Sequence, residues 1–136
     1  MAPRFYLGER LRMIEYTVKV RADGTKEWYL NDKLHREDGP AIEFANGSKF
    51  WYLNDKYHRE DGPAIEFANG DKSWYLNGKL HREDGPAIEC VNGSKYWWLN
   101  DEKVTEEEHK RMTSPVVEMT VAEINKALGK QVKVVG

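Results

Sequence analysis

The 136-residue sequence predicts a mainly β fold, an antiparallel sheet of stacked 23-residue β-hairpin repeats with a small α/β cap at the C-terminus. Tryptophan recurs every 23 residues, at Trp28, Trp51, Trp74 and Trp97. The run His-Arg-Glu-Asp-Gly-Pro-Ala-Ile-Glu recurs unchanged at 35–43, 58–66 and 81–89. A fixed period of this length indicates a repeat array, because each unit buries its apolar surface only against its neighbours.

We expect three segments within a single compact domain. Residues 1–22 form an N-terminal cap, because 13–20 alternate between apolar and polar side chains as a strand does. Residues 23–100 form the array. Residues 101–136 lack the repeat and form a helix and strand cap over one end of it. Capping strands are needed because an open sheet edge invites aggregation.

The second repeat illustrates the unit. Residues 40–44 alternate as a strand, and Asn46-Gly47 follows, a strong hairpin signal because both residues tolerate positive φ. Residues 49–53 form the return strand, rich in aromatic side chains that suit a pleated surface. Residues 54–56 turn again, and 57–63 lead to the next strand, which starts at a proline.

The C-terminal segment carries two helix signals. Thr105 with Glu108, and Thr120 with Glu123, each match a capping box. The first helix runs through about Met112, and the second ends at Gly129, a residue typical of helix C-caps. We expect 116–119 to be extended and 131–135 to form a closing strand.

Composition excludes several classes of protein. Basic and acidic residues number 21 and 23, a net charge of −2, so the footprint of a nucleic-acid binder is missing. The single cysteine, Cys90, occupies the position of Phe44 and Phe67 in other repeats, and we expect it to fill a core site. The N-terminus lacks the apolar run of a signal peptide, so we expect a cytoplasmic protein.

Two faces of the predicted sheet differ in side chains. We expect the core on the face of the four tryptophans, together with Ile42, Ile65, Ile88 and the Phe/Cys positions. The opposite face carries an aromatic set at Tyr29, Tyr52, Tyr75 and Trp98, flanked by the variable residues Glu27, Phe50, Ser73 and Tyr96. This second face is either covered, by the tail helices or by plain sheet packing, or is an interaction surface of the residue types enriched at protein interfaces.

The histidines and arginines of the nine-residue run form two rows, at His35, His58 and His81 and at Arg36, Arg59 and Arg82. A metal site needs several ligands that converge, and general acid–base chemistry needs one asymmetric group of residues. Three stacked copies offer neither, so we expect no metal, no cofactor and no catalysis. Our favoured interpretation is that each arginine pairs with acids of a neighbouring unit and each histidine bonds a backbone group in a turn.

The repeat resembles the MORN repeat family in its divergent variants. The matching residues are Asn46-Gly47 through Trp51, then Asn54-Asp55-Lys56, and their equivalents one period on. The resemblance covers roughly 23–100 and extends to repeat proteins of bacteriophages and large DNA viruses. It implies a curved sheet of hairpins that serves as a scaffold or an interaction surface.

Three functions follow as hypotheses. The favoured one is a non-enzymatic protein–protein interaction module, a phage-encoded protein that binds and inhibits or redirects a host defence protein. The alternatives are a module that binds lipid headgroups, and a small-ligand binder or enzyme that uses the His/Arg row. A homodimer through an open sheet edge is also possible. The candidate partner-binding residues are Tyr29, Tyr52, Tyr75, Trp98, Phe50, Tyr96, His35, His58, His81, Arg36, Arg59 and Arg82.

Overall fold

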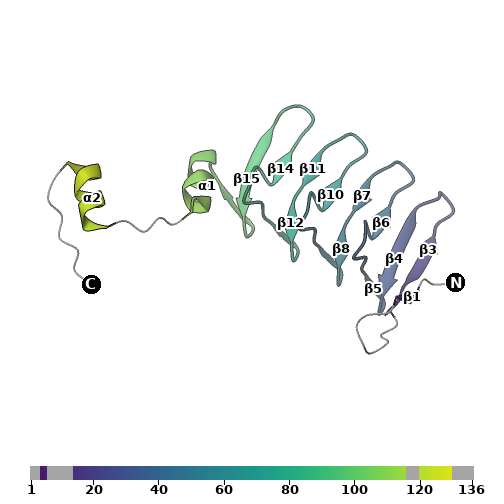
Figure 1. Ribbon diagram of the computed structural model, residues 1–136. Coiled ribbons are helices and arrows are strands. Elements are labelled where there is room, and N and C mark those ends of the chain that lie inside the picture. The colour runs from purple at the N-terminus through teal and green to yellow at the C-terminus, as the bar shows by residue number, and fades with distance from the viewer. Residues whose placement is uncertain (1–3, 6–13, 116–119, 130–136) are drawn as a thin grey trace.

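The computed structural model describes residues 4–5, 14–115 and 120–129, and it shows the predicted array. Ten strands form one antiparallel sheet in which successive repeats lie side by side (Figure 1). Across the sheet the strands are β16 (Glu102–Val104), β15 (Lys95–Leu99), β14 (Ile88–Glu89), β11 (Lys72–Ser73), β10 (Ile65–Glu66), β7 (Lys49–Phe50), β6 (Ile42–Glu43), β4 (Lys26–Leu30) and β3 (Thr17–Val20). The tenth, β5 (Lys33–Leu34), pairs with β4 beside this path.

The return strand of each inner repeat is divided in two, which the sequence pattern did not predict. In the second repeat β7 ends at Phe50 and β8 (Tyr52–Leu53) begins after Trp51, and β8 pairs with β9 (Lys56–Tyr57) in a separate hairpin. The third repeat has the equivalent hairpin of β12 (Tyr75–Leu76) and β13 (Lys79–Leu80). At the division the Trp51 N–H bonds to the Ala64 carbonyl at 2.7 Å, and the Trp51 carbonyl accepts from the His58 N–H at 3.1 Å. Trp28 makes the same two bonds, but β4 is continuous there because β3 also pairs along it, with Val18 opposite Trp28.

The two turns of the repeat differ in type. At Asn54-Asp55 both residues have positive φ, 50° and 64°, as a two-residue type I′ turn requires. At Asn46-Gly47 only the glycine does, with φ 94°, and Asn46 Oδ1 instead accepts from the Ser48 N–H at 2.9 Å. The Phe44 N–H bonds to the Ser48 carbonyl, so three residues form this loop. The hairpin predicted at Asn46-Gly47 is confirmed, with positive φ at the glycine alone.

The longer loop changes which side chains share a face. A two-residue loop at Asn46-Gly47 would have set Ile42 opposite Trp51, whereas the observed register sets Ile42 opposite Phe50. Directly opposed residues lie on the same face, and a shift of one residue reverses every side chain. Our prediction that the isoleucines share a face with the tryptophans was therefore wrong. Ile42 and Ile65 are buried, but on the side of Phe50.

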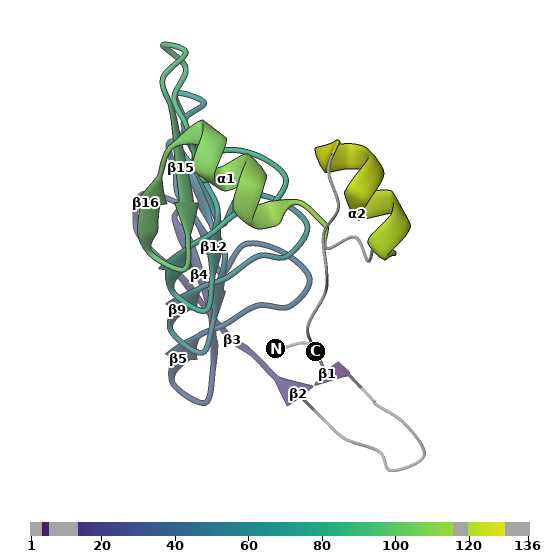
Figure 2. The same cartoon turned by 90° about the vertical axis from the view of Figure 1, so that its left-hand side faces the viewer.

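The connections that carry the nine-residue run cross one face of the sheet. In the view along the array these loops lie on one side of the strands, as does the helix α1 (Glu106–Thr113) (Figure 2). We call this side the loop face, because Arg36, Arg59 and Arg82 of the loops lie over Trp28, Trp51 and Trp74. The alanine that ends each loop, at 41, 64 and 87, is fully buried.

Hydrogen bonds from side chains join each repeat to the next at both ends of the strands. At the end that carries the three-residue loops, the side-chain oxygen of one repeat accepts from a backbone N–H of the next. The pairs are Thr25 Oγ1 with Ala45, Ser48 Oγ with Ala68, and Asp71 Oδ1 with Val91. At the type I′ turn, Asp55 Oδ1 accepts from the Leu34 N–H at 2.6 Å, and Asp101 repeats this on Leu80. Thr25 and Ser48 are buried, which explains why small polar residues occupy these positions.

The third turn lacks one of these bonds, because Gly78 stands where the others have aspartate. We expect Gly78→Asp to raise the free energy of unfolding by roughly 1 kcal/mol through a new bond to the Tyr57 N–H. The φ of 79° suits aspartate, as Asp55 and Asp101 show, and a Cβ would lie 3.7 Å from that of Lys56, an ordinary contact. Urea denaturation measures the change. Gly78→Ala is the control, and it should destabilise, because it adds the strain without the carboxylate.

Both ends of the sheet differ from the array between them. At the N-terminal end β3 pairs with β4 and caps the sheet as predicted, and β2 (Ile14–Glu15) pairs with β1 (Arg4–Phe5). At the C-terminal end both bonds of the Thr105–Glu108 capping box are present, and the α1 residue His109 is buried, its Nε2 2.6 Å from the Arg82 carbonyl. Helix α1 thus contacts the third loop, at the place that a fourth loop of the array would occupy.

The second predicted helix is also confirmed. Helix α2 (Val121–Leu128) has the Thr120–Glu123 capping box and ends at Gly129 with φ 66°. It lies apart from the sheet in both views, so the capping role belongs to α1 (Figures 1 and 2). The extended segment expected at 116–119 and the closing strand expected at 131–135 lie outside the described residues.

Candidate functional site

Each arginine of the nine-residue run is held over a tryptophan of the loop face. The guanidinium carbons of Arg36, Arg59 and Arg82 lie 4.0, 3.9 and 3.9 Å from the ring centroids of Trp28, Trp51 and Trp74. Stacking of a planar guanidinium on an indole is favourable, and here it places the arginine side chain over half-buried apolar surface. The tryptophans are thus covered by their own repeat rather than sealed in a closed core.

The remaining bonds of each arginine stay within the same loop and its following strand. In the second loop Arg59 donates through Nε to Asp61, and through Nη1 to the Pro63 carbonyl and to Glu66. The first and third loops repeat this set of contacts. Our prediction that these acids pair with arginines of a neighbouring unit was therefore wrong, because residues two and seven positions ahead already satisfy the guanidinium.

The position of the arginine side chain explains why each loop has a glycine three residues after it. A Cβ at Gly62 would lie 2.9 Å from the Arg59 guanidinium carbon, and Gly39 and Gly85 are equally close to Arg36 and Arg82. Such a contact is too short, so a larger residue would displace the guanidinium from the indole. The contacts that fold each loop thus explain most of the repetition of the Arg-Glu-Asp-Gly-Pro segment.

The histidines join one repeat to the next, which confirms the predicted bond to a turn. Nδ1 of His35, His58 and His81 accepts from the N–H of Asn54, Asn77 and Asn100 at 3.0, 2.9 and 3.0 Å. An accepting Nδ1 carries no proton, so each ring is in its neutral form with the hydrogen on Nε2. Nε2 then faces a glutamate of the same loop at 3.4 to 3.7 Å.

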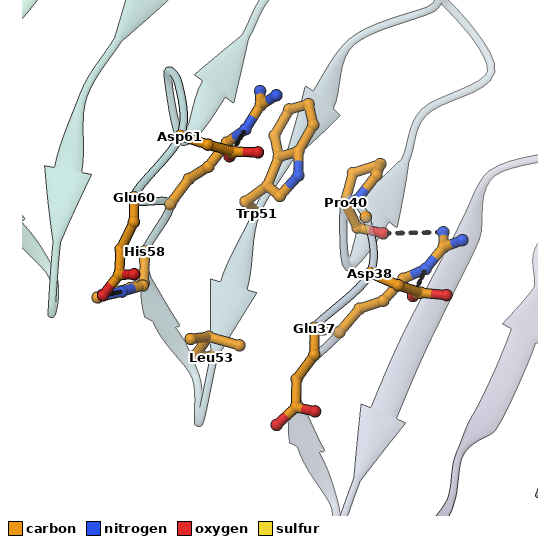
Figure 3. Close-up of a pocket in the computed structure, with 11 residues that line it drawn as sticks. Glu37, Asp38, Pro40, Trp51, Leu53, His58, Glu60 and Asp61 are labelled. Carbon is orange, nitrogen blue, oxygen red and sulfur yellow. Dashed lines mark hydrogen bonds and ion pairs between the residues drawn. The ribbon is translucent and has the colours of Figure 1, made fainter. Parts of the chain in front are cut away.

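Between successive loops the surface forms two equivalent clefts. The first, of about 740 Å³, lies between the loops of Arg36 and Arg59, with Trp51 and Leu53 between them (Figure 3). The second, of about 680 Å³, lies one repeat further on, around Trp74 and Leu76. Within the described residues, no three His, Cys, Asp or Glu side chains group as a metal ion would require.

The opposite side of the sheet is lined by aromatic rings that contact one another across repeats. Phe50 packs against Phe44, Tyr57 and Phe67 with ring centroids 4.7, 5.9 and 5.6 Å apart. Tyr57 lies between Tyr52 and Tyr75, at 4.5 and 5.1 Å. We call this set, Phe44, Phe50, Tyr52, Tyr57, Phe67 and Tyr75, the aromatic face.

Two of the predicted partner-binding residues near the ends of this side lie under lysines. Lys19 Nζ lies 4.5 Å from the Tyr29 ring centroid, and Lys103 Nζ lies 4.8 Å from that of Tyr96. Trp98 continues the row of Tyr52 and Tyr75, and its buried Nε1 has no hydrogen-bond partner among the residues that the structure describes. The structure thus separates the predicted residues, with the His/Arg set on the loop face and the aromatic set on the other.

The aromatic face includes residues that we had not predicted there. Phe44 and Phe67 were assigned to the tryptophan side, and Tyr57 was not singled out. For Phe44 the missing information was the hairpin register. For Tyr57 a signal was present, since tyrosine there replaces the leucine of the other repeats at 34 and 80, and it directly opposes Tyr52.

Packing on the aromatic face raises the pKa of the Tyr52 phenol well above its usual range, through burial first and then the neighbouring Tyr57. Burial likewise raises the pKa of Tyr75. Unfolding exposes both phenols to water, where they ionise near pH 10. The stability that depends on their neutral form is therefore complete below pH 10 and is lost as the pH rises above it.

We expect spectrophotometric titration at 295 nm to show Tyr52 ionising after the exposed phenols, together with loss of β structure. Tyr52→Phe should move alkaline unfolding to higher pH, because it removes a group that ionises on unfolding. Simultaneous ionisation of all phenols in the folded protein would contradict this assignment.

Comparison with family models, with curated proteins and with solved structures gave no match to this chain. Among the helices that the structure describes, none is long and apolar enough to cross a membrane.

Proposed function

We propose that this protein is a non-enzymatic module that docks onto another protein through its aromatic face. The observation that carries the proposal is a group of contacting aromatic rings, each only partly buried, on the side of the sheet away from the loops. In the part of the chain that the structure describes, the loops and α1 lie on the other side (Figure 2). Phe67 remains 44% exposed there. Exposed apolar surface of this kind is typical of docking sites.

The side chains indicate the chemistry of the partner. An apolar centre of phenylalanine and tyrosine favours an apolar patch on the other protein, because such rings bury much area at low entropic cost. Lys19 and Lys103 lie at the two ends of this side, so acidic residues flanking that patch would match them. The resemblance to viral repeat proteins makes a host protein the first partner to test.

Variation between repeats also supports this side rather than the loop face. The positions of Glu27, Phe50, Ser73 and Tyr96 differ in every repeat, whereas the nine-residue run is identical in all three copies. A surface that fits one partner needs different side chains along its length. The lipid alternative has less support, because across the sheet the register sets lysines opposite glutamates, as for Lys49 between Glu43 and Glu66.

Site-specific photo-crosslinking in cells tests the proposal. A benzophenone side chain in place of Phe67 should give one defined adduct, and the same group in place of Met112, which is 58% exposed on α1, should not. Adding Tyr96→Glu should abolish the Phe67 adduct without unfolding the protein. Identical adducts from both sites, or an adduct only with a second copy of the chain, would contradict docking on another protein. Recovery on anionic vesicles instead would favour the lipid alternative.

A further inference from the structure

The loop face carries a second feature that the proposed function does not use, the pair of equivalent clefts between loops. Each is lined by one loop on either side and by a tryptophan and a leucine between them. In the first cleft one side of the Trp51 ring is covered by Arg59, and the ring lies between the two loops with Leu53 (Figure 3). A cleft lined by an indole and a leucine accommodates an aliphatic or flat side chain.

The accessible charge of the first cleft is negative. Four carboxylates line it, at Glu37, Asp38, Glu60 and Asp61, against the two guanidiniums of Arg36 and Arg59. The arginine side chains are only 20% and 21% exposed and are already bonded within their own loops, whereas the glutamate and aspartate side chains are 63% to 86% exposed. The neutral His58 ring adds no charge, because its Nδ1 accepts a hydrogen bond.

Two carboxylates of this cleft have spare bonding capacity. Glu37 and Glu60 each lie near a histidine Nε2, at 3.4 and 3.6 Å, beyond the length of a strong hydrogen bond. Glu60 lines both clefts, since its loop forms the wall between them. A cation with an apolar stem, the side chain of arginine or lysine, places its stem against Trp51 and its head at these carboxylates.

The distance between the two clefts favours one backbone conformation for a peptide ligand that occupies both. Adjacent clefts are one repeat apart, which is two strands of the sheet, or roughly 9.5 Å. In an extended β-strand, residues three apart span about this distance but point to opposite sides. A polyproline II helix rises ~9.3 Å in three residues and returns to the same side. Its every third side chain therefore matches successive clefts.

We propose that the two clefts together bind a polyproline II segment that carries arginine or lysine at every third position. One basic side chain enters the cleft at Trp51 and the next enters the cleft at Trp74, with Glu60 between them. The segment runs along the array, across the strands. This site lies on the face opposite to the proposed protein-docking face and does not depend on it.

Fluorescence anisotropy with labelled synthetic peptides tests the proposal on the full chain. A peptide of four Arg-Pro-Pro units should bind, and an isomer with the same composition but its four arginines adjacent should bind at least about tenfold more weakly, because it loses the match to the ~9.3 Å period. In ¹H–¹⁵N spectra the indole signals of Trp51 and Trp74 should shift on titration. The signal of Trp97, outside both clefts, should stay in place.

Matched variants separate a specific site from general acidic attraction. Glu60→Gln should weaken binding of the Arg-Pro-Pro peptide about two- to fivefold, the effect of one solvent-exposed ion pair. Glu107→Gln on α1 removes the same charge outside the clefts and should leave affinity unchanged. Equal binding of the two peptide isomers, equal effects of the two variants, or binding of spermine as tight as that of the peptide would each overturn the proposal.

Discussion

Replacing Trp51 by alanine should lower the free energy of unfolding by roughly 3 kcal/mol, near the lower end of the range for removing a large aromatic side chain. The ring is half-buried rather than enclosed, which reduces the cost, but Arg59 loses the surface on which it stacks. Because stability in a repeat array depends on each contact between neighbours, loss at the central repeat should also reduce cooperativity.

Urea denaturation followed by far-ultraviolet circular dichroism measures both effects. Trp51→Phe is the control, because it keeps a ring beneath the guanidinium and should recover more than half of the loss. If the alanine variant unfolds at the same urea concentration as the parent protein, the tryptophan side contributes little to the core.

Arg59→Ala should have the second largest effect, a loss of about 2 kcal/mol. The change removes the stacking on Trp51 and the bonds to the Pro63 carbonyl and to Glu66. Arg59→Lys keeps the charge but not the planar fork, so we expect it to recover less than half of the lost stability. Thermal unfolding of the three proteins provides the comparison.

The equivalent substitution at Arg36 tests whether the contact is a property of the repeat. Arg36 makes the same set of contacts over Trp28, so Arg36→Ala should cost a similar amount. A lysine variant at position 59 that is as stable as the parent would show that charge alone suffices. The interpretation of the guanidinium as a planar cover for the indole would then be wrong.

Several elements were predictable because their signals are local. The capping boxes at Thr105 and Thr120 and the left-handed Gly129 depend only on residues within one helical turn, and the structure shows all three. The bond from each histidine to a turn was also predicted, because one histidine per repeat in a regular array offers no converging site. The partners of the arginines were not predicted correctly. Every repeat carries the same carboxylates, so the sequence does not show whether an arginine pairs with those of its own loop or with those of the next repeat.

Periodicity by itself determined that this protein is an array of hairpins. Alternation at 13–20 predicted the strand at its N-terminal end, and the Thr105–Glu108 capping box predicted the helix at its C-terminal end. Only the tertiary structure decided which side chains share a face. Asn46-Gly47 is compatible with a two-residue or a three-residue loop, and the bond from the Phe44 N–H to the Ser48 carbonyl selects the longer one. Because side chains alternate along a strand, that single residue moves Ile42 from the side of Trp51 to the side of Phe50.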